Sequence, residues 1–139
     1  MKKLILLLFL IPNLVMAENL MLICEGDKII KIGEGEESLH QDKIAAIIND
    51  KFIEWDGRKF IDRDYQPTDE LGNSHNGHYF KDDKEIIFWD NLYKASGYGI
   101  SIKGNINRLT GEFHYQSSLH KPDIFTVFYG SCKKRDKAF

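Results

Sequence analysis

Two histidines close together are the first residues in this chain whose type and spacing suggest chemistry. His75 and His78 lie in the stretch GNSHNGHYF, and neutral imidazoles bind zinc-like metals together with a carboxylate such as Asp69 or Glu70. A working site needs about three or four fixed ligands supported by further hydrogen bonds. The sequence marks no third ligand, so we predict no metal and no cofactor. The sequence alone does not decide whether His75 and His78 bind metal.

Acidic side chains are the next candidates. Asp82, Asp83 and Glu85 could act as a carboxylate pair, but nothing in the sequence buries one of them, as general acid catalysis requires. The segment Asp62-Arg63-Asp64 resembles the start of a calcium loop, yet the other acidic positions and the glycine of an EF-hand are absent. We interpret these acids as surface charge.

A serine and histidine pair could also be assembled from Ser117, Ser118, His114 and His120. The Gly-x-Ser-x-Gly elbow that exposes a nucleophilic serine is absent, and the chain has no phosphate-binding loop. The sequence therefore predicts a protein that is not an enzyme and has no catalytic residues.

The chain contains two cysteines, Cys24 and Cys132. In an exported protein, the economical interpretation is one disulfide between them, which requires the first and last strands to be neighbours. The alternatives are a metal-binding pair, which this wide spacing hardly supports, and two free thiols.

Export is predicted by the N-terminus, MKKLILLLFLIPNLVMA. Lys2 and Lys3 precede an apolar run, and Val15 and Ala17 occupy the small-residue positions before a cleavage site. The apolar run is shorter than the roughly 20 residues that a membrane-spanning helix needs. We predict a signal peptide at 1–17, a β-domain at 18–132, a basic tail at 133–139, and a periplasmic or secreted protein without membrane insertion after cleavage.

Charge excludes one class of partner. Cleavage would remove Lys2 and Lys3, leaving 17 of the 19 basic residues against 21 acidic ones, a net charge of about −4. A mildly acidic chain gives no general attraction to nucleic acid or to anionic membranes, so neither is expected as a partner.

The elements that would position these residues are short strands. We predict strands at 20–24 and 28–32 around a Gly26-Asp27 turn, and strands rather than a helix between Asp42 and Ile61, because Asp56-Gly57 is a hairpin signal. The stretch from Asp62 to Gly77 has no periodicity and is the predicted surface loop.

The clearest alternation lies in the C-terminal half. Residues 98–107 place Ile100, Ile102 and Ile106 on one face. If residues 108–111 form a turn with Gly111 left-handed, Ile106 falls opposite Phe113, and Gly104 falls opposite Tyr115, whose ring would cover it. The apolar segment 124–132 predicts a covered or central strand.

Seven or eight strands without a convincing helix predict a single small antiparallel β-barrel or sandwich, with its N- and C-terminal strands linked by the disulfide. Two tryptophans, six tyrosines and nine phenylalanines are a large aromatic content for one domain. Core packing accounts for most of them, and the rest favour a binding surface or an apolar cavity.

Three motifs carry a resemblance. Cys24-Glu25-Gly26, the stretch from Ile106 to Phe113 and the final Tyr129-Gly130-Ser131-Cys132 are similar to features of uncharacterised bacterial secreted proteins. The resemblance implies a small β-protein and an exported location, and it supplies no catalytic residue.

Ser96-Gly97-Tyr98-Gly99 faintly resembles the inhibitory loop of periplasmic inhibitors of C-type lysozyme, which are also small disulfide-linked β-barrels. We therefore expect an exported, non-enzymatic binding protein whose partner is an unknown protein. The alternatives are an inhibitor of a host hydrolase and a barrel that carries a small apolar ligand in a cavity lined by Ile100, Ile102 and Phe113. The sequence does not set the oligomeric state.

Overall fold

The structure is a computed structural model that describes residues 19–62, 70–121 and 123–135. These residues form nine antiparallel strands and no helix, so the predicted all-β fold is confirmed. In chain order the strands are β1 (Leu20–Ile32), β2 (Glu37–Ile48), β3 (Phe52–Trp55), β4 (Arg58–Ile61), β5 (Ser74–Lys81), β6 (Glu85–Tyr93), β7 (Gly99–Asn107), β8 (Glu112–His120) and β9 (Ile124–Lys134).

Some predictions concern residues outside these ranges. The predicted signal peptide at 1–17, the acidic residues Asp64 and Asp69, and the end of the predicted tail lie there. The start of the tail differs from the expectation, since Lys133 and Lys134 belong to β9 and pair with β1. The described ranges contain no helix long and apolar enough to cross a bilayer.

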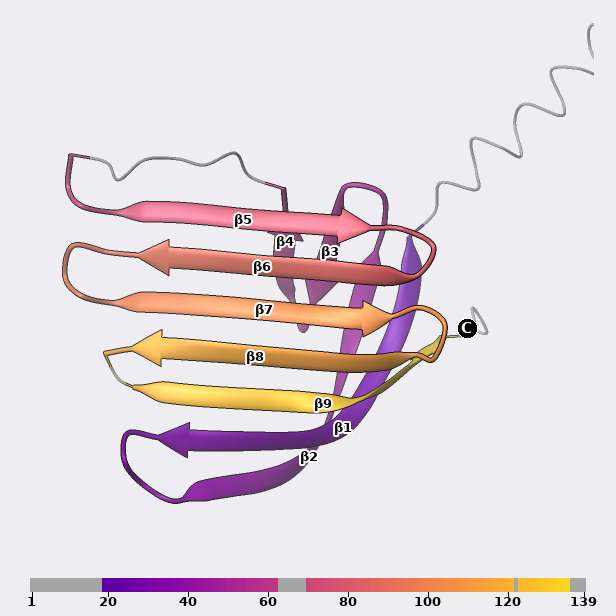
Figure 1. The fold of residues 1–139 in the computed structure, drawn as a ribbon, viewed down its shortest axis with the longest axis horizontal. Helices are drawn as coiled ribbons and strands as arrows, with labels where there is room; N and C mark the ends of the chain where they lie inside the picture. Colours follow the sequence, from indigo (N-terminus) through magenta and orange to yellow (C-terminus); the bar gives the residue numbers. More distant parts are fainter. Residues whose placement is uncertain (1–18, 63–69, 122, 136–139) are drawn as a thin grey trace, which may run out of the picture.

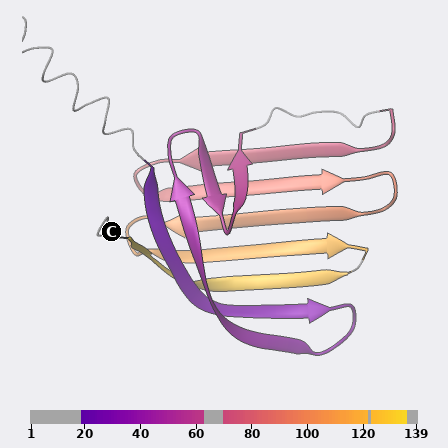
Figure 2. The same cartoon turned by 180° about the vertical axis from the view of Figure 1, so that it is seen from behind.

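All nine strands belong to one sheet, in the order β4-β3-β2-β1-β9-β8-β7-β6-β5, and the sheet curls until β4 approaches β5 and β6. Figures 1 and 2 show that β1 and β2 bend, so that part of each crosses one face of the sheet together with β3 and β4. We call the sheet under β3 and β4 the covered half. The open half is the remainder, which ends at the β1–β2, β6–β7 and β8–β9 turns.

Aromatic rings fill the space under β3 and β4. The Trp55 ring lies 5.3 Å from that of Phe113, 5.5 Å from Phe88 and 5.6 Å from Tyr115, measured between centroids. Phe113 meets Phe128 edge-on at 4.7 Å. Such contacts make a packed core. The other buried hydrophobic side chains are Leu22, Cys24, Ile44, Ala46, Ile48, Ile53, Phe60, Tyr79, Ile86, Ile102 and Ile106.

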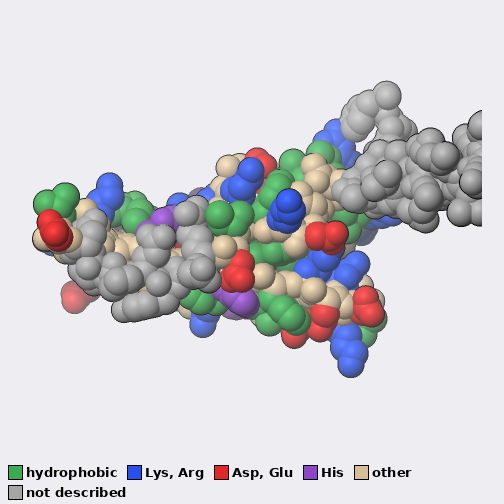
Figure 3. Space-filling model, turned by 90° about the horizontal axis from the view of Figure 1, so that it is seen from above, with side chains coloured by type: hydrophobic (Ala, Val, Ile, Leu, Met, Phe, Trp, Pro, Cys, Tyr) green, Lys and Arg blue, Asp and Glu red, His purple; other side chains and the backbone are tan. Residues whose placement is uncertain are grey.

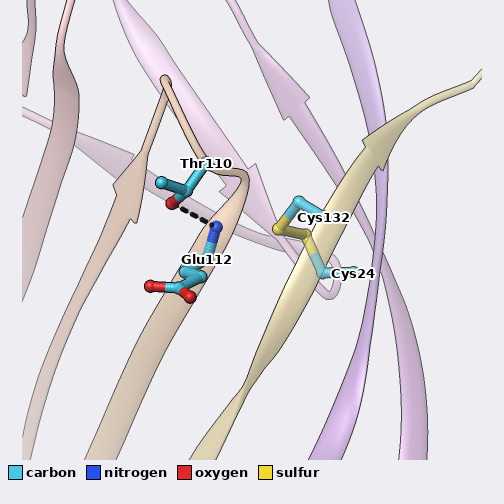
Figure 4. The surroundings of a disulfide bond; sticks show 4 residues. All are labelled: Cys24, Thr110, Glu112 and Cys132. Atoms are coloured by element: carbon cyan, nitrogen blue, oxygen red, sulfur yellow. Dashed lines mark hydrogen bonds between the residues drawn. A yellow bond between two sulfur atoms is a disulfide. The ribbon is translucent and has the colours of Figure 1, made fainter.

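The disulfide between Cys24 and Cys132 is present, as predicted (Figure 4). The two residues lie directly opposite each other on β1 and β9, with their Cα atoms 3.9 Å apart. The neighbouring turn is tied to the same place, because the Cys132 N–H donates to the Gly111 carbonyl at 2.7 Å. The first strand, the last strand and the β7–β8 turn are therefore joined at one point.

The predicted turn at Gly26-Asp27 is wrong, because both residues lie inside the continuous strand β1. Gly26 is directly opposite Gly130 of β9. A Cβ atom added at Gly26 would lie 2.0 Å from the Tyr129 carbonyl oxygen, and one at Gly130 would lie 2.1 Å from the Glu25 carbonyl oxygen. The glycines let the two backbones approach at this pair, and they do not end the strand.

The hairpin of β7 and β8 has the predicted register. Ile106 is opposite Phe113, Gly104 is opposite Tyr115, and Gly111 has a φ of 80°. The ring that covers Gly104 is nevertheless that of Phe88 on β6, which is paired with Gly104 from the other side. Tyr115 instead stacks on Trp55, because β3 brings the indole over it.

The strand interpretation of residues 42–61 is confirmed by β2, β3 and β4. Asp56 and Gly57 form their turn with φ of 49° and 83°, as an Asp-Gly hairpin requires. The loop predicted from Asp62 to Gly77 is shorter than expected, since β5 already begins at Ser74 and pairs with β6.

Candidate functional site

A row of partly exposed apolar side chains crosses the open half of the sheet. Strand pairing places these residues side by side on five neighbouring strands, on the face that carries the core. We call them the apolar row: Ile32, Ile124, Leu119, Ile100 and Leu92. Neighbouring strands are about 4.8 Å apart, so the row is about 19 Å long.

The apolar row lies beyond the hairpin of β3 and β4, which stays over the covered half (Figure 2). Ile32 is 63% exposed, and the other four side chains are half-buried. In the described ranges, Ile100 is the only one of the five that packs against the core. The five side chains therefore form a partly exposed apolar stripe on the open half of the sheet.

The next row toward the core mixes apolar and polar side chains. Strand pairing aligns Ile30, Thr126, Ser117, Ile102 and Asp90 in this row. Asp90 is 5% exposed and is the only buried charged side chain in the described ranges. A buried carboxylate requires partners, because removing a charge from water is costly.

Asp90 has a partner on each of its carboxylate oxygens. Arg58 of β4 donates to Oδ2 at 2.8 Å, and His75 of β5 lies with Nε2 2.8 Å from Oδ1. The three residues attach β4 to β5 and β6 at the border of the covered half. Both carboxylate oxygens are thus used in contacts that join strands, which is a structural role.

Tyr79 and Tyr115 lie in the row of side chains that follows the Asp90 row toward the core. Burial raises the pKa of Tyr115, and it raises the pKa of Tyr79 to about 12. The Tyr79 hydroxyl donates to the Asn49 carbonyl at 2.7 Å. Both phenols therefore remain neutral at ordinary pH and act as packing groups.

The two histidines that suggested a metal do not face one site. His75 and His78 are three residues apart on β5, so their side chains point to opposite faces of the sheet. His75 contacts Asp90, whereas Nδ1 of His78 lies 2.9 Å from Oδ1 of Asp62. Within the described ranges no group of three or more histidine, cysteine or acidic side chains is arranged to hold a metal ion.

Asp82, one of the acidic residues near the β5–β6 turn, has a structural role. Asp82 accepts hydrogen bonds from the backbone N–H groups of Lys84 and Glu85, both at 2.8 Å. These bonds hold the pKa of Asp82 below its usual value. The turn hydrogen bonds favour the ionised form of this exposed carboxylate. A general acid must hold a proton, so Asp82 does not suit that role.

The serines and histidines of β8 are divided between the two faces of the sheet. Ser117 lies on the inner face with Tyr115, while His114, Ser118 and His120 alternate on the outer face. Nδ1 of His120 lies 3.6 Å from Asp123, the nearest acid that pairs with it. No Ser-His hydrogen bond joins these residues in the described part of the chain.

Positive and negative side chains are mixed on the face that is seen from above in Figure 3. Figure 3 shows lysine and arginine interspersed with aspartate and glutamate over the described part of this view. Mixed charge gives no long-range attraction for one kind of polyion. Charge on this face therefore does not indicate a polyion as the partner.

Comparison of the chain with models of protein families, with curated proteins and with solved structures finds no match. The site has to be interpreted from its own chemistry.

The sequence predicts Ile100, Ile102 and Phe113 as residues that could line a cavity. Ile102 and Phe113 are each 3% exposed and belong to the packed core, and Ile100 alone lies on the apolar row. The other members of the row were missed because each is one apolar residue near a strand end. These residues can be recognised as one row only when the register of the five strands is known.

Proposed function

We propose that this protein is an exported, non-enzymatic binding protein whose apolar row binds an apolar segment of another protein. The observation that carries the proposal is the row itself, five apolar side chains aligned on five strands beyond the reach of β3 and β4. Its length of about 19 Å suits an amphipathic helix of roughly three and a half turns, or a strand of about six residues.

Hydrogen-bond donors lie at one end of the row. His75 pairs with Leu92 across β5 and β6, and the side chains of His75 and Arg58 are 33% and 39% exposed although both contact Asp90. The exposed N–H groups of these two side chains can donate hydrogen bonds, which favours an acceptor such as a carboxylate on the partner at this end. The partner we propose is a segment with apolar side chains along its length and a carboxylate next to its last apolar residue.

Export is part of the proposal. A disulfide between the first and last strands persists in oxidising compartments, which favours a periplasmic or secreted protein. A non-enzymatic role is supported by the contacts of two acidic side chains. Asp82 accepts hydrogen bonds from its own turn, and Asp90 joins neighbouring strands. Cell fractionation and thiol alkylation test the location: the protein should appear outside the cytoplasm with both cysteines blocked.

A photo-crosslinking amino acid at Leu119 tests the binding function. Leu119 lies in the middle of the apolar row, and its neighbour Ser118 points to the opposite face of β8. We expect a probe at position 119, introduced in living cells, to give a discrete crosslinked product, while the same probe at position 118 gives none. Products from both positions, or from neither, would contradict the proposed site.

The β6–β7 turn supports a second candidate, inhibition of a hydrolase. The turn is held by a hydrogen bond from the Lys94 N–H to the Tyr98 carbonyl at 2.8 Å and by one from Lys121 Nζ to the Ser96 carbonyl at 3.1 Å. A pre-ordered exposed turn binds an active site at low entropic cost. C-type lysozyme activity should fall when the protein is added, and Tyr98→Ala should abolish the effect; an unchanged rate would remove this candidate.

A further inference from the structure

The free edge of β2 presents a second surface, distinct from the apolar row. β1 pairs with all of β2, whereas β3 pairs only with Ala46–Ile48. Between Glu37 and Lys43, no other described strand lies beside β2. Five consecutive side chains here, from Glu37 to Gln41, are exposed. An edge of this length offers unpaired N–H and C=O groups to another strand.

The hydrogen bonds around β2 show which backbone groups point outward. The Asp56 N–H donates to the Ala45 carbonyl at 3.1 Å, so the polar groups of Ala45 face away from β1. Backbone direction alternates along a strand, and the same orientation applies to Lys43, Gln41, Leu39 and Glu37. The Lys43 N–H is already bonded to Oδ1 of Asp42 at 2.8 Å.

We propose that two copies of the chain pair through this edge in antiparallel orientation, with Leu39 opposite Leu39 of the second copy. In this register Glu37 lies opposite Gln41 of the second copy. Outward-pointing residues then face outward-pointing residues, and each pair exchanges N–H···O bonds as in an ordinary antiparallel ladder. The bond between Asp42 and Lys43 caps the ladder at its end.

The side chains of the edge fit a second copy. Leu39 is 67% exposed and lies beside Ile29, which pairs with Val127, so an apolar line on the outer face leads to the edge. Pairing would continue that line into the second copy. Charged residues usually protect an edge from pairing, but Glu37 of one copy lies diagonally next to Lys43 of the other, within reach of two long side chains of opposite charge.

Analytical ultracentrifugation of the oxidised protein tests the dimer. We expect the average mass to rise from monomer toward dimer between about 5 μM and 1 mM, because a short ladder buries less surface than a permanent interface. Leu39→Pro removes one outward N–H group without removing a hydrogen bond to β1. The variant should therefore have the melting temperature of the wild type but should no longer dimerise.

Charge reversal supplies an independent readout that does not depend on a proline. Glu37→Lys and Lys43→Glu should each weaken association about tenfold, since each replaces two attractive pairs by two repulsive ones. The double variant Glu37→Lys/Lys43→Glu should restore wild-type association. A protein that stays monomeric at about 1 mM, or a dimer that neither Leu39→Pro nor the charge reversals affect, would overturn the inference.

Discussion

Gly104 and Phe88 provide a stringent test of the core. Gly104 of β7 lies opposite Phe88 of β6, and a Cβ atom at position 104 would come within 2.2 Å of the Phe88 ring. The ring is fully buried between Trp55 and Phe60, with centroids 5.5 Å and 4.8 Å away, so it has nowhere to move. We predict that Gly104→Ala destabilises the protein through this one contact.

The size of the effect follows from the packing. Forcing a methyl group into a packed core costs about 1–3 kcal/mol, and because the ring cannot move we expect Gly104→Ala to cost about 3 kcal/mol. Phe88→Leu removes the far edge of the ring, where the contact occurs, and should cost about 1.5 kcal/mol by itself. In the Phe88→Leu background, Gly104→Ala should cost less than about 1 kcal/mol, which is a coupling of about 2 kcal/mol.

Equilibrium unfolding in urea, followed by tryptophan fluorescence, measures these free energies. Gly99→Ala is the matched control on the same strand. A Cβ atom there would lie 2.9 Å from the ring of Tyr93, which is 46% exposed and free to turn away. If Gly104→Ala costs no more than Gly99→Ala, or if its cost is the same with and without Phe88→Leu, the assignment of Phe88 as the ring over Gly104 is wrong.

Three further predictions concern stability. Replacing Cys24 and Cys132 together by serine should lower the free energy of unfolding by up to about 4.7 kcal/mol in the chain-entropy account, since the disulfide closes a separation of 108 residues, and a thermal melt under oxidising conditions measures the loss. Asp90→Asn should cost about 1–3 kcal/mol in urea unfolding, because Arg58 loses its buried partner. The lowered pKa of Asp82 means that its turn bonds stabilise the fold above the unfolded pKa near 3.9 and are lost as the pH falls. Wild type and Asp82→Asn should therefore differ in urea midpoint at pH 6, and the difference should shrink as the pH is lowered below about 3.9.

Local turn chemistry made most of the fold predictable. Asp56-Gly57 and the segment ending at Gly111 need positive φ, and both gave the observed hairpins. The turn predicted at Gly26 was wrong because the sequence does not show which residue lies opposite a glycine in a sheet. Its real reason, the close approach to Gly130, depends on a pairing between the two ends of the chain.

The site was less predictable than the fold, for a physical reason. The residues with recognisable chemistry, such as His75, His78 and Asp82, are held by local partners. The apolar row consists of ordinary aliphatic residues, and it exists only because five strands stop in register at the open half. Strand ends and long-range register are the features that sequence periodicity specifies least.

The binding proposal depends most directly on whether the apolar row captures a protein partner. A tagged protein purified from envelope extract should retain one partner in stoichiometric amount, and Leu119→Asp should lose it while the melting temperature stays near that of the wild type. Ser118→Asp places the same charge on the opposite face of β8 and should retain the partner. Equal retention by the two variants would contradict the proposed binding site.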